Sequence, residues 1–458
     1  MAEVTFGGWA GSNGNGRTSP ETVFSNVRIL DGTGEAPYSG DVTVAGNRIK
    51  TIHRAGSGGF GAGYGGGHGN GGWGAPNGAQ RIDGRGMTLM PGMVDAHLHL
   101  SWNNAPGIDP IQLMPLEEHT LNCAYMAKLL IDAGFTAGYG AAAAKPRLDV
   151  VIRDAIKEGK VPGPRYTAAG PELTAVGGLG DATLPHIDHK ALNLGIVVSG
   201  VEEMRREVRT LMKWGVDTIK INLSGEEITQ FAAEENQFTD EEVAVAVAEA
   251  KGRGRRLAAH ARSKESIQRC VKHGIEIIYH ASFSDEETLD LLEANKDKHF
   301  VAPGLAWLIN VARNAAEWGI KPGTPITDRY ERELENACAT MLAMHKRGIR
   351  VLVGGDYGFA WTPHGTNAKD FEYFVDMVGF SPMEAIKAGT MYGGQIMGMG
   401  DELGMIREGC LADLLLVDGD PLTDIKVLQD QSRLIAIMQD GKFHKEPDLN
   451  RVGMRLSA

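Results

Sequence analysis

The chain has 458 residues, of which 42% are hydrophobic and 23% are charged, and its formal net charge is −12. This composition is ordinary for a globular protein, and the negative charge argues against nucleic acid or an anionic membrane surface as a partner. No uninterrupted apolar run reaches the roughly 18 residues of a spanning helix, and no secretory signal is visible. The four cysteines are widely spaced without a Cys-x-x-Cys pair, which predicts reduced thiols in a cytoplasmic protein.

The first 90 residues predict part of a small β domain. Residues 22–29 and 41–52 alternate partly between apolar and polar side chains and are punctuated by Asp-Gly and Gly-Asn turns. Segment 56–78 is dominated by glycine and cannot bury enough apolar surface to hold one conformation, so it is predicted to be a flexible loop. His68 within it is expected to be exposed.

From residue 91 to residue 399 the pattern is one of strands that alternate with helices. Such alternation favours an α/β fold, here a (β/α)8 TIM barrel. Capping-box spacing in Thr239-x-x-Glu242 and Ser284-x-x-Glu287 lies ahead of or within two expected helices, and a third helix is expected at Ser381, with proline in its first position. The expected strands are 92–99, 134–140, 164–170, 217–222, 256–261, 276–281, 299–304 and 350–356.

After residue 400 the pattern returns to strands, in 404–406, 412–417 and 434–440. Both ends of the chain are therefore rich in β structure and flank the barrel. We expect one small β-sandwich domain built from residues 1–90 and 400–458.

Two histidines, His97 and His99, close the first expected barrel strand in Met-Pro-Gly-Met-Val-Asp-Ala-His-Leu-His-Leu. Side chains alternate along a strand, so both imidazoles point to one face, with Leu98 on the other. Two imidazoles at one strand end can ligate a metal together. Two hydrogen-bonded histidines without a metal are the more common explanation of an isolated pair.

Four further polar residues fall at the carboxyl ends of expected barrel strands, where barrel active sites lie. Alternation turns Lys220 inward on the fourth strand and His260 inward on the fifth, while His280 ends the sixth and Asp356 the eighth. Each alone has an ordinary explanation, such as pairing of Lys220 with Glu276, a hydrogen-bonded histidine or a helix-capping aspartate. Core packing gives no reason for the whole set around one rim, whereas metal binding does.

These residues, in this order along the chain, resemble the amidohydrolase superfamily. The resemblance extends to Leu-Ala-Asp-Leu-Leu at 411–415 and Asp-Gly-Asp-Pro at 418–421, and covers roughly residues 22–440. The chain is most similar to the branches of the prolidases and ochratoxin hydrolases and of the bacterial phenylurea and thiocarbamate (molinate) hydrolases. It departs from the pattern in Ala281-Ser282, where many relatives have glycine, and in the glycine-rich loop.

The resemblance implies two divalent metal ions, with zinc expected and cobalt, manganese or iron as alternatives. Desolvation and nearby positive charge would lower the pKa of the Lys220 amine, and the resemblance implies that this amine adds carbon dioxide to become a carbamate that bridges both ions. Asp356 would take a proton from an ion-activated water and deliver it to the leaving nitrogen. The implied ligands are His97, His99 and Asp356 for one ion and His260 and His280 for the other, with Lys220 between them.

The expected substrate contacts lie in the loops after the strands. Trp102, Trp307, Phe359 and Trp361 suit an apolar or aromatic ligand, although they could equally pack the loops against one another. A substrate contact is also open for His364.

Two further polar features leave alternatives open. Arg262 points inward two residues after His260 and could bind a substrate carboxylate, or pair with a neighbouring acid. His186, Asp188 and His189 form a second cluster, expected to be a lid or surface loop.

The expected function is metal-dependent hydrolysis of an amide, urea or (thio)carbamate carbon–nitrogen bond in a small, fairly apolar molecule. The alternative is a prolidase-like dipeptidase or N-acyl-amino-acid hydrolase, favoured if Arg262 binds a carboxylate. A cyclic amidohydrolase comes third, and a non-catalytic scaffold would predict missing ligands. The resemblance also suggests a homo-oligomer.

Overall fold

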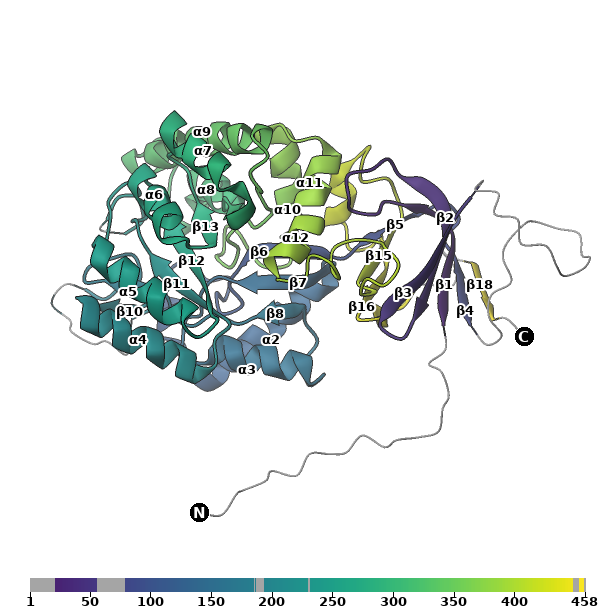
Figure 1. Cartoon of the computed structure of the whole chain (residues 1–458), viewed down its shortest axis with the longest axis horizontal. Coiled ribbons are helices and arrows are strands. Elements are labelled where there is room, and N and C mark those ends of the chain that lie inside the picture. The colour runs from purple at the N-terminus through teal and green to yellow at the C-terminus, as the bar shows by residue number, and fades with distance from the viewer. Residues whose placement is uncertain are drawn as a thin grey trace, which may run out of the picture.

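The structure, a computed structural model, describes residues 21–55, 79–184, 186, 193–229, 231–447 and 453–456. Figure 1 shows two parts: helices packed around short strands, and a β-sheet beside them that contains strands from both ends of the chain. His68, Asp188 and His189 fall outside the described residues, as does the glycine-rich segment 56–78. In the described ranges no helix is both long and apolar enough to cross a membrane, and the four cysteines are free thiols.

One nine-stranded mixed sheet joins the two ends of the chain, in the order β17-β16-β15-β5-β1-β2-β3, with β4 pairing to β1 and β18 off this path. Strand β1 pairs with β2 along one edge and with both β4 and β5 along the other, which connects all nine strands. The strands expected from both ends thus form one connected sheet, where two sheets of a sandwich were predicted. They are β1 (Thr22–Ile29), β2 (Tyr38–Ala45), β3 (Arg48–Arg54), β4 (Gln80–Asp83), β5 (Thr88–Pro91), β15 (Leu414–Val417), β16 (Leu434–Gln439), β17 (Lys442–Lys445) and β18 (Gly453–Leu456).

Two parallel sheets form the barrel part. One has the order β6-β7-β8 and the other β10-β9-β11-β12-β13-β14. The sequence did not predict β9 and β10, and β9 takes the place beside β11 expected for β8. The strands are β6 (Met93–Leu98), β7 (Phe135–Gly140), β8 (Arg165–Thr167), β9 (Leu173–Ala175), β10 (Ile196–Val198), β11 (Thr218–Asn222), β12 (Arg256–Ala261), β13 (Ile277–His280) and β14 (Phe300–Ala302).

The eighth expected strand, 350–356, is reduced to a single parallel bridge between Val301 and Val351. It still links the two sheets, because the Ala96 N–H donates to the Val353 carbonyl at 3.0 Å. Gly354 allows this close approach, since a Cβ there would lie 2.7 Å from the backbone nitrogen of β6 that it faces. Among the described residues the ladders do not close into the continuous eight-stranded barrel that was expected.

Helices cover the outside of the barrel strands (Figure 1). This α/β layering agrees with the predicted class. The helices are α1 (Asp109–Gln112), α2 (Leu116–Asp132), α3 (Leu148–Lys157), α4 (Val201–Trp214), α5 (Asp240–Lys251), α6 (Lys264–His273), α7 (Glu286–Ala294), α8 (Leu305–Arg313), α9 (Pro325–Lys346), α10 (Lys369–Tyr373), α11 (Pro382–Ala388) and α12 (Met391–Ile396).

Two of the three expected helix starts are confirmed. Thr239 and Ser381 form capping boxes with the glutamates three residues on, at the starts of α5 and α11. The third spacing, at Ser284, lies just ahead of α7 as expected, but it forms no capping box. Asp285, not Ser284, caps α7, and its side chain accepts from the Thr288 N–H at 2.9 Å. Aspartate and serine cap helices about equally well, so spacing alone could not choose between them.

The nine-stranded sheet is fastened to the barrel at the start of β6. The Gly92 N–H donates to the Asp413 carbonyl at 2.9 Å, and the Gln439 amide donates to the Thr136 carbonyl at 2.7 Å. The first bond fixes the residue before β6, which carries the histidine pair, and the second fixes β7, which pairs with β6.

Candidate metal centre

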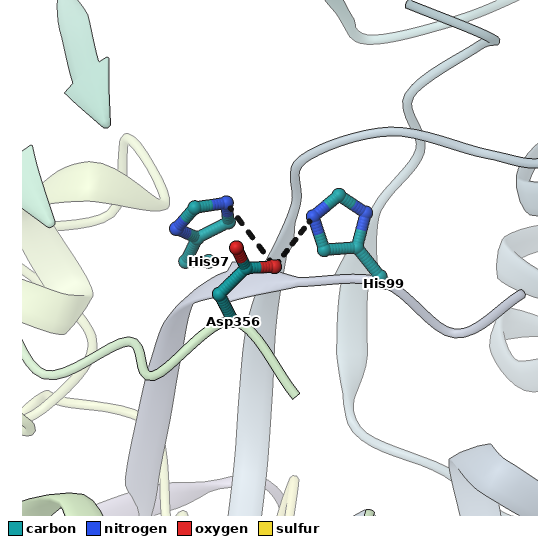
Figure 2. A group of neighbouring side chains, drawn as sticks. All are labelled: His97, His99 and Asp356. Atoms are coloured by element: carbon teal, nitrogen blue, oxygen red, sulfur yellow. Dashed lines mark ion pairs between the residues drawn. The ribbon is translucent and has the colours of Figure 1, made fainter. Parts of the chain in front are cut away.

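His97, His99 and Asp356 converge at the carboxyl end of the barrel strands, each with a ligand atom within 4.8 Å of the others. Figure 2 shows both imidazoles directed at the carboxylate. Asp356 Oδ1 lies 3.2 Å from Nε2 of His99 and 3.8 Å from Nε2 of His97. Two imidazole nitrogens and a carboxylate oxygen around one point are suitable ligands for a divalent transition metal.

A hydrogen bond holds the His99 ring in this orientation, whereas His97 is held through its backbone and a ring stack. His99 Nδ1 lies 3.0 Å from the Ala142 carbonyl, so a proton on Nδ1 leaves the Nε2 lone pair facing Asp356. The backbone N–H of His97 donates to Asp95 Oδ1 at 2.9 Å, and the Asn367 amide donates to Asp95 Oδ2 at 2.8 Å. The His97 ring itself stacks on Tyr279, with centroids 3.8 Å apart. A ring hydrogen bond of the kind that His99 makes orients metal-binding histidines in proteins.

His260 and His280 lie beside this group, with ring centroids 4.3 Å apart, and His280 is 5.1 Å from the His97 ring. His260 Nε2 is 2.9 Å from the Gly225 carbonyl and 3.2 Å from Nε of Arg262, so both contacts are made at Nε2 and neither uses Nδ1. Both ring nitrogens of His280 are buried without a hydrogen-bond partner in the described chain, a condition that a metal ligand would relieve. Burial holds the pKa of His97, His260 and His280 well below the usual value, which favours the neutral form that binds metals.

Lys220 reaches the same place from β11 and is fully buried, as its inward position predicted. Its Nζ lies 4.7 Å from the centroid of the Tyr279 ring. Burial lowers the pKa of this amine below its usual value, against two neighbouring carboxylates that raise it. The ordinary explanation, a pair with Glu276, does not hold, because Arg256 binds that carboxylate with two contacts of 2.6 Å.

The backbone is left-handed at three non-glycine residues of the site, with φ of +72° at His280, +54° at Ala281 and +63° at Asp356. Such conformations cost free energy and gather at functional sites. Burial by itself raises the pKa of the Asp356 carboxyl, but the imidazoles of His97 and His99 outweigh it and hold the pKa well below its usual range.

Arg262 lies behind the metal ligands in a buried cluster of charges. Its Nη1 donates to Glu333 and its Nη2 to Glu226. Tyr330 donates its hydroxyl to Glu226 and Ser282 donates to Glu333, both at 2.6 Å. Of the two roles open for Arg262, the structure shows pairing with neighbouring acids, and the guanidinium does not line the cavity.

A cavity opens over the ligands. Trp361 stacks on Phe359 behind the cavity wall, with centroids 5.3 Å apart. His364 is buried, with Nε2 2.9 Å from the His99 carbonyl, and is not part of the lining. His186 is exposed. The aromatic lining residues are Trp102, Trp307 and Phe359, and the aliphatic ones are Ile108, Leu179, Leu194 and Ile228.

Two glutamates that the sequence analysis did not single out also line this cavity, Glu172 and Glu226. They lie just before β9 and shortly after β11, in segments without strand or helix periodicity. The one available signal was an acidic residue within a few positions of a strand end, where barrel sites collect.

Comparison with known families shows to which family the chain belongs. The amidohydrolase family model matches residues 88–443, which span both the ligand set and the end of the β-sheet. The chain belongs to the amidohydrolase family. It is therefore a hydrolase of amide-type carbon–nitrogen bonds, in a family that uses divalent metal ions, and the predicted resemblance is confirmed.

The relatives fall in the predicted branches. An ochratoxinase of Aspergillus niger is 28% identical over 394 residues, covering 80% of this chain and 77% of that protein. The structure of a prolidase complexed with N-methylphosphonate-L-proline is 26% identical with a TM-score of 0.80, over 93% of this chain and 100% of the other. Molinate hydrolase, at 20% identity, a TM-score of 0.73 and coverage of 93% and 95%, shares the TIM-barrel-like fold.

Proposed function

We propose that this amidohydrolase cleaves an amide, urea or (thio)carbamate bond in a small, fairly apolar molecule, using two divalent metal ions. The observation that carries the proposal is the convergence of His97, His99 and Asp356 at the floor of a cavity with aromatic and aliphatic walls. An apolar wall around a few convergent polar groups is typical of small-molecule sites.

The residues present fit a two-ion site. The unpaired ring nitrogens of His280 and the unpaired Nδ1 of His97 are buried polar atoms that lack partners in the described chain. His97, His99 and Asp356 would hold one ion and His260 and His280 the other. When bound, such ions polarise a scissile carbonyl and lower the pKa of water toward about 7. Zinc is the ion we expect, with cobalt, manganese or iron as alternatives.

Lys220 would contribute through a carbamate formed from carbon dioxide. The bond forms between Nζ and the carbon of carbon dioxide, and the amine loses one proton. Burial of Nζ favours the neutral amine that this addition requires. Incubation with ¹³C-bicarbonate and metal, followed by ¹³C NMR, should give a carbamate resonance that is missing in Lys220→Met.

Asp356 is the proposed proton carrier. Its carboxylate would accept the proton of the attacking water and return it to the leaving nitrogen, so that the amine departs neutral. The hydrogen bond of the His99 ring and the stacking of the His97 ring on Tyr279 fix the two imidazoles that face this carboxylate. The neighbouring aromatic rings form part of the apolar wall of the cavity.

A dipeptidase is the second candidate, because a prolidase and a Xaa-Pro dipeptidase resemble this chain at 26% and 27% identity. The engagement of Arg262 with Glu226 and Glu333 weighs against it, since this guanidinium is not available for a substrate carboxylate. A cyclic amidohydrolase has no specific observation in its favour.

A hydrolysis screen tests the proposal. Protein loaded separately with zinc, cobalt or manganese is compared on N-acyl anilides, phenylureas, thiocarbamates, N-acyl amino acids and X-Pro dipeptides. We expect turnover of the amides or ureas that lack a free carboxylate, loss of turnover on chelation, and recovery when metal is restored. Full activity in metal-free protein would overturn the proposal.

A further inference from the structure

The carboxylates that line the cavity differ in the partners that they have. Among its described lining residues, three carboxylates, Glu172, Glu226 and Asp356, face one amine, Lys220. Glu226 is bound by the Arg262 guanidinium and the Tyr330 hydroxyl. Asp356 faces the two histidines of the metal group. Glu172 is the one of these three carboxylates for which the described residues provide no such partner.

Glu172 is 5% exposed, and its side chain makes no hydrogen bond or ion pair with the part of the chain that the structure describes. It precedes β9 and is packed against Gly180, where an added Cβ would lie 2.9 Å from Glu172 Oε1. The glycine thus leaves just enough room for the carboxylate at the cavity wall. Burying a carboxylate without a partner costs free energy. A cationic group of a ligand that bound there would offset this cost.

Glu172 also lies near the reacting groups. Its carboxylate lines the same cavity as Lys220, Asp356 and the histidines of the metal centre. A cation bound at Glu172 would therefore belong to a part of the substrate close to the scissile carbonyl. The α-ammonium of an aminoacyl group is such a part.

We propose that Glu172 binds the ammonium group of the substrate and that this enzyme prefers aminoacyl amides with an apolar or aromatic side chain and no free carboxylate. The aromatic wall of Trp102, Trp307 and Phe359 would receive the apolar portion. A free carboxylate finds no unpaired side-chain cation among the described lining residues other than Lys220, the proposed carbamate. This inference rests on the proposed function and narrows its substrate class.

The test uses metal-replete full-length enzyme and two chromogenic substrates, L-phenylalanine 4-nitroanilide and its N-acetyl derivative. The two differ in the charge of the α-nitrogen. We expect kcat/KM to be at least about tenfold higher for the free amine, since a charge-assisted pair supplies that much discrimination. Glu172→Gln should remove the preference, mainly by raising KM, and should leave the acetylated substrate within about twofold. Phe-Pro amide should be a better substrate than Phe-Pro.

Glu202→Gln, an exposed glutamate on α4, is the matched control and should keep the preference. Metal content and the ¹³C carbamate resonance should be unchanged in Glu172→Gln. Equal turnover of both anilides, or loss of metal or carbamate in Glu172→Gln, would overturn the inference while leaving the proposed function standing. Failure to hydrolyse either anilide or any screened amide, urea or carbamate would overturn both.

Discussion

Trp102 is stacked on the imidazole of His99, with ring centroids 4.2 Å apart and ring planes 24° apart. The Ala142 carbonyl fixes the same imidazole through Nδ1. The tryptophan thus serves both the cavity wall and the orientation of a proposed metal ligand. Its two effects can be separated experimentally.

Trp102→Ala should weaken metal binding by about tenfold to a hundredfold, the usual cost of losing support behind a metal ligand. Trp102→Phe keeps a ring over His99 and should stay close to the wild type. Competition with a chromogenic chelator measures the affinity. If Trp102→Ala bound metal normally and only KM rose, the stack would serve the substrate alone.

Asp356→Asn should lower kcat by about a hundredfold to ten-thousandfold, the range typical of general acid–base catalysis. His97 and His99 remain, so we expect metal to be retained at their end of the site. Metal analysis of the dialysed protein, together with turnover, distinguishes loss of proton transfer from loss of the ion. An Asn variant with full turnover would contradict the proposed role.

Arg262→Met should destabilise the protein by about 3–5 kcal/mol, because it leaves the carboxylates of Glu226 and Glu333 buried without their cation. The free energy of unfolding in urea measures this. Adding Glu333→Gln to the variant should recover part of the loss, since one uncompensated charge is removed. Arg332→Met, which breaks an exposed pair with Glu234, should cost at most about 1 kcal/mol.

Asp149 should make the stability depend on pH. Burial raises the pKa of this carboxyl from 3.8 to about 7, against a hydrogen bond from the Tyr166 hydroxyl that lowers it. The folded protein thus holds a proton that the unfolded chain releases, so this contribution is full below about pH 4 and is lost as pH rises to about 7.

The difference in unfolding free energy between pH 5 and pH 8 should therefore be smaller in Asp149→Asn than in the wild type. The asparagine oxygen can still accept from Tyr166, so the comparison isolates the charge. Urea titrations of both proteins at the two pH values provide the measurement. An identical pH dependence in the two proteins would show that Asp149 ionises freely in the fold.

Strand periodicity in the sequence predicted the positions of several site residues correctly. Alternation along Thr218–Asn222 and Arg256–Ala261 was enough to place Lys220 and His260 in the cavity, because a strand side chain has only two directions. The same reasoning failed for 350–356, where Gly354 and the left-handed backbone at Asp356 interrupt the regular strand. Asp356 nevertheless lies beside His97 and His99, although it does not belong to an extended strand.

Contacts between residues far apart in the chain could not be predicted from the sequence. Nothing local indicates that Arg262 meets Glu333, 71 positions later in the chain, so its alternatives stayed open. Glu172 was missed because it lies outside any periodic element. Side-chain direction in irregular segments is decided by packing that a single sequence does not reveal.

The pairing of β5 with β15 has a consequence for the order of folding. Met90 is made early on the ribosome, but its strand partner Leu415 emerges more than three hundred residues later. During that interval one edge of β5 has no strand to pair with, and unpaired edges invite association between chains. The nascent protein must therefore shield an incomplete sheet while its catalytic half is still being synthesised. Substitutions in β15 that weaken its pairing with β5 should therefore lower the yield of folded protein, while the protein that does fold should keep its activity.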